Sequence, residues 1–147
     1  MWEINQKTLK NSVKFSGIGL HSGVKVNVKL EPADGDHGII FIRTDLKNNQ
    51  KVVANFKNVT SAKLCTKIEN KFGTSVSTIE HLMAAFYICG VDNVVVNLDG
   101  PEVPIMDGSA KDFVKIINDW GVKTQEGNRK FIKINKKVEM KDSDKSI

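Results

Sequence analysis

The chain has 147 residues, of which 40% are hydrophobic and 27% are charged, a balance typical of one globular domain of ordinary size. No apolar run approaches the roughly 18 residues of a membrane helix, and residues 1–7 lack the apolar core of a signal peptide. We therefore expect a cytoplasmic protein without a transmembrane segment. The two cysteines, Cys65 and Cys89, fit that reducing compartment.

Lysine supplies almost all of the positive charge behind the net value of +5, since the only arginines are Arg43 and Arg129. Arginine is the usual residue for reading grooves and phosphates, so this composition argues against a nucleic-acid partner. A lysine-rich surface can still attract anionic ligands or lipid headgroups, which leaves peripheral association with a membrane open.

The first half of the chain has the pattern of short strands joined by glycine-rich and polar turns. Residues 24–30 alternate strictly between apolar and polar side chains, as a half-buried strand does. Residues 17–23 form a loop punctuated by glycines, and residues 32–38 form a turn. We predict strands, in chain order, at residues 8–15, 24–30, 39–42, 52–56 and 64–68.

A helix is predicted from Ser77 to Cys89, with Gly90 just beyond its end, where a positive φ costs little only for glycine. Ser77 and Glu80 have the spacing of a capping box. One buried stripe follows the i, i+3, i+4, i+7 rule and consists of Ile79, Leu82, Met83 and Phe86.

A strand at residues 93–98 and a loop with two prolines at residues 99–108 lead to a second helix. This helix is predicted to begin at Ser109, with Asp112 completing another capping box, and to end at Gly121. Its predicted core stripe is Phe113, Ile116, Ile117 and Trp120.

The last part of the chain is interpreted as a connection to further structure. Residues 123–128 are polar and linker-like, and residues 131–138 have the pattern of a strand, which either pairs with the first sheet or opens a second domain. We prefer the second interpretation. Residues 1–127 are then the first α+β domain, with the Glu80–His81 helix, and residues 128–147 are a linker and the first strand of a truncated second domain.

The predicted elements add up to an α+β fold. Several short strands and two amphipathic helices form a two-layer sandwich when the helices pack together on one face of a mainly antiparallel sheet.

Glu80 and His81 stand side by side at the start of the first helix, and two interpretations apply. In the first, Glu80 only caps the helix and His81 is a surface histidine. In the second, His81 is a zinc ligand and Glu80 a general base, because a helix N-terminus disfavours imidazolium and a carboxylate can take a proton from metal-activated water. Ala85 stands four residues after His81, so the H-E-x-x-H pattern is absent. A catalytic zinc needs three protein ligands, and the others would come from outside these 147 residues.

The other candidate side chains favour structural roles. His21 lies in the glycine loop, where a role in ordering the loop is favoured, and His37 lies in a polar turn and is expected to be solvated. Cys65 is expected to fill space in the core, and Cys89 to be buried at the end of the helix stripe. Asp107 is expected to cap or order its own loop.

Three segments resemble the UDP-3-O-acyl-N-acetylglucosamine deacetylase family of lipid A biosynthesis in Gram-negative bacteria. They are residues 77–85 (STIEHLMAA), 90–93 (GVDN) and 99–110 (DGPEVPIMDGSA). Residues 17–23 (GIGLHSG) and 43–46 (RTDL) are also similar to this family. The resemblance covers the whole chain in order, and its most specific part is the segment 99–110.

The resemblance implies two similar α+β domains with the active site between them. It implies a catalytic Zn²⁺ held by His81 together with a histidine and an aspartate of the second domain, and Glu80 as the general base. It also places Leu64, Cys65 and Thr78 at the substrate-binding cleft.

The reaction implied by the resemblance is hydrolysis of the N-acetyl group of UDP-3-O-acyl-N-acetylglucosamine, which releases acetate and is the committed step of lipid A biosynthesis. Since the second-domain ligands are not among these residues, this chain alone is expected to be inactive and to hold zinc weakly. The competing interpretation is a non-catalytic α+β module that binds RNA, which the lysine excess fits but the lack of an aromatic stacking pattern does not. Salt-dependent RNA binding would favour the module, and UDP-sugar binding by the full-length chain would favour the enzyme.

Overall fold

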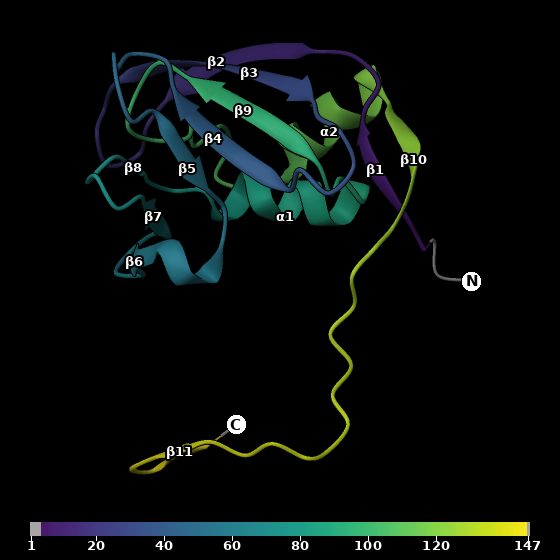
Figure 1. The fold of residues 1–147 in the computed structure, drawn as a ribbon. Helices are drawn as coiled ribbons and strands as arrows, with labels where there is room; N and C mark the ends of the chain where they lie inside the picture. The colour runs from purple at the N-terminus through teal and green to yellow at the C-terminus, as the bar shows by residue number, and fades with distance from the viewer. Residues whose placement is uncertain (1–3, 147) are drawn as a thin grey trace.

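The structure, a computed structural model, describes residues 4–146 and has a five-stranded sheet with both long helices on one face (Figure 1). The strand order is β2–β3–β9–β4–β5, and every neighbouring pair is antiparallel except β9 with β4, which is parallel. The strands are β2 (Val13–Ile18), β3 (Lys25–Pro32), β4 (Ile39–Arg43), β5 (Lys51–Val53) and β9 (Val94–Leu98), and the helices are α1 (Glu80–Cys89) and α2 (Lys111–Trp120). The predicted α+β two-layer sandwich is therefore confirmed.

The core lies between the sheet and the two helices. Alternate residues of β3 face it and are at most 2% exposed, namely Val26, Val28 and Leu30. From the helix layer, Leu82 and Phe86 of α1 are fully buried, and the ring of Phe113 on α2 packs edge-on against Phe15 of β2 with centroids 5.5 Å apart. Burial of these large side chains is what holds the helices on the sheet.

The predicted helix stripes are largely confirmed. On α1, Ile79, Leu82 and Phe86 are buried and Met83 packs against them. On α2, Phe113 and Ile117 are buried and Ile116 is partly buried, but the predicted core position of Trp120 is wrong because its side chain is 51% exposed at the end of the helix. Gly90 follows α1 in the left-handed conformation with φ of 70°, as predicted.

A second, smaller sheet stands at one end of the domain. It contains β6 (Val59–Ser61), β7 (Lys67–Glu69) and β8 (Ser75–Val76), which pair antiparallel in that order, and the 3-10 helix η1 (Phe56–Asn58) leads into it. Figure 1 shows it at the opposite end of the molecule from β1 (Asn5–Leu9) and β10 (Val122–Asn128). The sheet carries the segment that contacts the start of α1.

The N-terminal strand and the supposed linker pair with each other. The single strand predicted at residues 8–15 is divided by a bend at residues 10–12 into β1 and β2, which belong to different sheets. Residues 123–128, predicted to be a linker, form most of β10, which pairs antiparallel with β1. The linker interpretation of these residues is therefore wrong.

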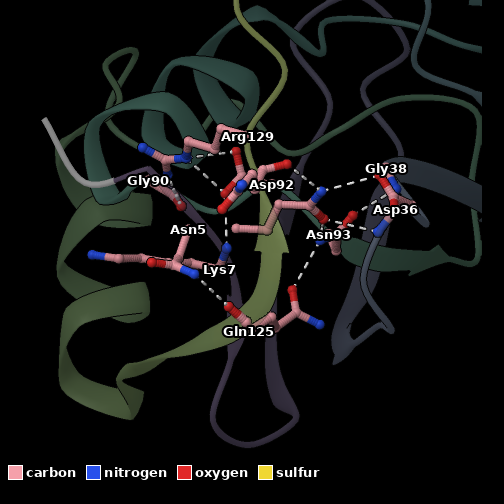
Figure 2. A network of polar contacts seen from close by, with 11 residues as sticks. Asn5, Lys7, Asp36, Gly38, Gly90, Asp92, Asn93, Gln125 and Arg129 are labelled. Atoms are coloured by element: carbon pink, nitrogen blue, oxygen red, sulfur yellow. Dashed lines mark hydrogen bonds and ion pairs between the residues drawn. The ribbon is translucent and has the colours of Figure 1, made fainter.

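The polar composition of β10 is explained by an amide network that joins it to the rest of the domain (Figure 2). Asn93, only 2% exposed, donates through Nδ2 to Gln6 Oε1 at 2.7 Å and to Gln125 Oε1 at 2.8 Å, and its Oδ1 accepts from the Gly38 amide at 2.8 Å. Gln125 Nε2 in turn donates to the Ala33 carbonyl at 2.9 Å. Hydrogen bonds hold β10, whose apolar contact with the core comes from Val122, and an apolar periodicity therefore does not reveal this strand.

Arg129 marks the point where the chain leaves this domain. Its Nε donates to both oxygens of Asp92 at 3.0 and 2.9 Å, its guanidinium also reaches the Gly90 carbonyl, and Asp92 Oδ2 accepts from the Lys7 amide at 2.8 Å (Figure 2). Residues 130–140 then run without a strand, and the strand predicted at residues 131–138 does not pair with the first sheet. Ile132 is 98% exposed, so this apolar pattern has no partner within the described residues.

Two further features complete the described chain. β11 (Lys141–Asp142) and β12 (Lys145–Ser146) form a separate two-residue hairpin at its C-terminal end. Within residues 4–146 no helix combines the length and the apolar composition needed to span a bilayer.

The packing of α1 predicts unequal effects of truncating two neighbouring aromatic residues. Phe86→Ala should lower the free energy of unfolding by about 3–5 kcal/mol, because the ring is fully buried between helix and sheet. Tyr87→Ala should change it by less than about 0.5 kcal/mol, because Tyr87 is 86% exposed. Urea denaturation of both variants measures the difference, and equal losses would contradict this orientation of α1.

Candidate active site

Glu80 and His81 occupy the first two positions of α1, and both are half-buried. The predicted capping box is wrong, since Ile79 is the N-cap residue and no side chain bonds the first turn. Ser77 is engaged instead with the 99–108 loop, where its amide donates to the Pro101 carbonyl at 3.0 Å and its carbonyl accepts from the Val103 amide at 3.1 Å. The Glu80 carboxylate is therefore not used to close the helix.

The Glu80 carboxylate is held from one side by the turn that precedes β7. Its Oε2 accepts from the Thr66 amide at 3.0 Å, and the Thr66 carbonyl accepts from the Ile79 amide at 3.4 Å. Oε1 has no hydrogen-bond partner among the described residues. One oxygen is thus fixed while the other is available to a ligand.

Leu64 and Cys65 lie in this turn rather than on a strand. The strand predicted at residues 64–68 is shorter, because β7 begins at Lys67. Leu64 has a φ of 66°, a conformation that a strand does not allow, and its side chain is 83% exposed. Cys65 is half-buried, so its predicted role as core filler holds only in part. Leu64 and Cys65 directly precede Thr66 in the chain, and because the Thr66 amide bonds Glu80, the turn brings them to the Glu80 side of the helix.

Thr78 is fixed from the other side by Glu102, the buried carboxylate of the 99–108 loop. Thr78 has a φ of 56°, which is uncommon for a β-branched residue, and it is 2% exposed. Its hydroxyl donates to Glu102 Oε1 at 2.7 Å. This bond keeps Thr78 in a strained backbone conformation two residues before Glu80.

Glu102 also collects the glycine loop that precedes β3. The amide of His21 donates to its carboxylate at 3.1 Å and the amide of Ser22 at 2.8 Å. A Cβ on Gly19 would lie 2.5 Å from Glu102 Oε2, so glycine is required there for the loop to approach. His21 thus takes part through its backbone, which agrees with the structural role predicted for it, while its side chain is exposed.

Glu102 is ionised in this setting. Burial raises the pKa of its carboxyl group, but hydrogen bonds from the His21 backbone, from Ser22 and from the Thr78 hydroxyl outweigh burial and lower the pKa to about 2. Desolvation of a carboxylate is costly unless donors surround it, and here several do. The charge is therefore stable only while the glycine loop and Thr78 stay in place.

The donor set for a metal consists of one histidine. Residues 4–146 contain no group of three His, Cys, Asp or Glu side chains placed to hold an ion. The His81 ring has no hydrogen-bond partner within the described residues, so its ring nitrogens are available to a ligand. One histidine fits a single ligand position of a zinc site, and the described residues do not complete the set.

The remaining candidates have local roles. Asp107 Oδ1 accepts from the amide and the hydroxyl of Ser109 at 2.9 and 2.8 Å, so it orders its loop as predicted. The ring of His37 contacts its neighbouring Gly38 carbonyl at 3.1 Å and is half-buried rather than fully solvated. Cys89 is half-buried at the end of α1, and burial raises the pKa of its thiol.

A separate hollow of about 710 Å³ lies along β2, β3 and β9, and it includes neither Glu80 nor His81. Its lining is polar, and part of that lining is already paired. Lys29 forms an ion pair with Glu31, and Asn97 donates a hydrogen bond to Glu31. We therefore place the candidate site at the start of α1, where Glu80 has one carboxylate oxygen without a hydrogen bond and the neighbouring His81 ring has none within the described residues.

This chain is similar to known proteins over nearly its whole length. The family described as UDP-3-O-acyl N-acetylglycosamine deacetylase (LpxC) matches residues 6–147. This chain belongs to that deacetylase family. Curated UDP-3-O-acyl-N-acetylglucosamine deacetylases of Geotalea uraniireducens, Actinobacillus succinogenes and Pasteurella multocida are 51%, 45% and 46% identical to it over 142 residues, which is 97% of the chain.

The chain spans about half the length of the curated deacetylases it matches, 46% of the first and 47% of the other two. Within that half, sequence reasoning singled out Glu80 and His81 but missed Glu102. The only signal for Glu102 is an acid between Gly100-Pro101 and Val103-Pro104, in an otherwise apolar stretch of the deacetylase loop. An acid buried among apolar neighbours requires donors, and this could have marked the residue.

The low pKa of Glu102 predicts a pH-dependent contribution to stability. The pKa rises from about 2 when folded to its ordinary 4.5 when unfolded, so the stabilisation is complete above pH 4.5 and is lost as the pH falls toward 2. Glu102→Gln should therefore lower the free energy of unfolding near neutral pH, on the order of 3 kcal/mol, and the gap from the parent chain should close in acid.

Chemical denaturation at a series of pH values measures this gap. Glu126→Gln, on an exposed position of β10, is the control and should unfold like the parent to within about 0.5 kcal/mol. A gap that stays constant down to pH 2 would mean that the Glu102 charge does not matter for folding.

Proposed function

We propose that the full-length protein hydrolyses the N-acetyl group of UDP-3-O-acyl-N-acetylglucosamine with a catalytic zinc, and that Glu80 and His81 belong to its active site. The supporting observation is the pairing at the start of α1 of a carboxylate with one unpartnered oxygen and an imidazole without a hydrogen bond. Membership of a family whose members are named for this deacetylation gives the substrate. In cells the reaction would be the committed step of lipid A biosynthesis.

In this proposal, zinc supplies the Lewis acid that polarises the acetamide carbonyl and makes water acidic enough to attack it near neutral pH. His81 would contribute one of its ligands from the first turn of α1. A second domain would supply the other two ligands, as a zinc site requires.

Glu80 is the proposed general base. Its Oε1 accepts the proton of the attacking water, while the Thr66 amide holds Oε2 and so sets the direction of the carboxylate. The same group then delivers the proton to the departing nitrogen, which leaves as a free amine on the sugar, and the acetic acid formed releases its remaining proton to solvent to give acetate. The carboxylate ends as it began, so protons and charge balance over the cycle.

Leu64 and Cys65 are proposed to border the substrate, and Thr78 to act beside them on the position of the helix. Leu64 exposes its side chain beside the Glu80 turn, and such a surface can contact an apolar part of the substrate. Thr78 is buried and bonded to Glu102, so we assign its contribution to the position of the helix start rather than to an exposed contact.

Replacement of the base should separate catalysis from metal binding. In the full-length protein, Glu80→Gln should lower kcat for deacetylation by about 10²- to 10⁴-fold, because the amide cannot accept the proton, while the zinc content stays that of the parent. Acetate release and metal analysis measure the two effects, and Glu126→Gln serves as the control. Unchanged turnover, or loss of zinc together with activity, would contradict the role of Glu80.

The 147-residue chain itself should hold zinc only weakly, because its described residues offer one histidine at the proposed site. After purification in the presence of zinc and desalting, it should contain well under one ion per chain and show no deacetylase activity. Inductively coupled plasma analysis measures the content. One tightly held ion per chain, lost in His81→Ala, would show that the ligand set is complete without a second domain.

A further inference from the structure

The net positive charge of this protein is concentrated in one part of the fold. Residues 46–73 contain six lysines and a single acid, Glu69, whereas the other 119 residues contain 16 basic and 16 acidic residues and balance. We call residues 46–73 the basic lobe; it comprises β5, η1, β6, β7 and their connections. The whole formal excess of +5 thus resides in this lobe.

The lysines of the basic lobe are presented to solvent. Lys67 is half-buried and pairs with Glu69 at 3.3 Å. The other five are exposed and make no ion pair within the described residues, namely Lys47, Lys51, Lys57, Lys63 and Lys71. Their charge is therefore available to an anionic partner.

Large apolar side chains are exposed on the same lobe. Phe56 is 80% exposed, Leu64 83% and Phe72 60%. Lys57 Nζ lies 5.9 Å from the centroid of the Phe56 ring, and Lys71 Nζ lies 5.0 Å from that of Phe72. Each exposed ring thus carries a lysine ammonium beside it, so ring and charge are displayed together.

The two ring–lysine pairs stand at the same end of the small sheet. β6 and β7 are antiparallel, so the chain that enters β6 after η1 and the chain that leaves β7 lie at one end. Asn70, between β7 and Phe72, fastens this end to β5 by donating to the Lys51 carbonyl at 2.9 Å. Figure 1 places the small sheet at the end of the domain away from β1 and β10.

We propose that this end of the basic lobe docks the protein on an anionic lipid bilayer. The Phe56 and Phe72 rings gain by entering the boundary between headgroups and acyl chains, and the adjacent Lys57 and Lys71 face the headgroup phosphates. Charge complementarity favours a membrane as the partner. A protein or RNA partner would not require exposed rings flanked by compact, strongly hydrated ammonium groups, and the phosphates of nucleic acids are recognised mainly by arginine. The lobe has no arginine.

The same lobe contacts the candidate active site, because the turn at its other end includes Thr66, whose amide bonds Glu80. The strands between the two ends are three residues long, or roughly 10 Å. A docked lobe would therefore hold Glu80 close to the membrane surface. This consequence, though not the docking itself, rests on the proposed function, in which the substrate carries an acyl chain.

Vesicle sedimentation of the chain tests the docking without any catalytic readout. The probes are vesicles of phosphatidylethanolamine with phosphatidylglycerol, vesicles of phosphatidylcholine alone, and a single-stranded oligouridylate. We expect binding to the anionic vesicles that weakens steeply with added salt, and little binding to phosphatidylcholine. Tighter binding to the oligouridylate than to the anionic vesicles, or equal binding to both vesicle types, would overturn the proposal.

Paired variants place the binding surface. Lys57→Gln with Lys71→Gln should weaken binding to the anionic vesicles by about 10-fold or more, whereas Lys111→Gln with Lys115→Gln, which removes the same charge from exposed positions of α2, should weaken it far less. Phe56→Ser with Phe72→Ser should also weaken binding of the protein to the anionic vesicles. Ile132→Ser with Ile134→Ser removes equally exposed apolar groups elsewhere and should not.

Thermal unfolding of each variant confirms that the fold is intact, which the exposure of all these side chains leads us to expect. Loss of vesicle binding only in the Ile132→Ser and Ile134→Ser variant would assign the membrane contact to residues 130–140 and overturn the assignment to the basic lobe. Absence of deacetylase activity in the full-length protein, together with vesicle binding by this chain, would overturn the proposed function and leave the docking intact.

Discussion

A buried carboxylate organises the region on which the proposed chemistry depends. Glu102 receives the amides of the glycine loop and the hydroxyl of Thr78, and these donors outweigh the cost of burying its charge. Thr78 leads directly into α1 and bonds Glu102, which lies 24 residues later in the sequence. Glu102 in turn bonds Ser22, which lies 80 residues before it. The direction of Glu80 and His81 is therefore set by residues that are distant in sequence. A site built in this way is positioned by long-range hydrogen bonds, whereas the helix that carries it is held by apolar packing.

The parts of the fold that follow from apolar periodicity were the parts that sequence alone could predict. Each of these parts follows from a simple physical requirement. The alternation in β3 and the apolar stripe on α1 follow from a buried face, and the end of α1 at Gly90 follows from a positive φ. Glu80 and His81 stood out because two reactive groups open a helix whose other side is apolar.

The parts that sequence could not predict are those that polar groups determine. β10 has few apolar residues, and its place is set by amides of Gln6, Asn93 and Gln125 that pair only in three dimensions. The prediction of a strand at Leu64 was wrong because the chain there adopts a left-handed conformation, which the residue types do not indicate. Glu102 was missed because its donors come from distant segments, and a single sequence does not show which loops meet.

Arg129 fixes where the chain departs, and it does so at the end of α1 opposite to Glu80 and His81. The helix has ten residues and is about 15 Å long. Any group that residues after Arg129 bring to His81 must therefore return along the whole helix, and an extended segment needs at least about five residues to cover that span. The ion pair between Arg129 and Asp92 thus sets the minimum length of the segment that can connect this domain to any group that completes the site at His81.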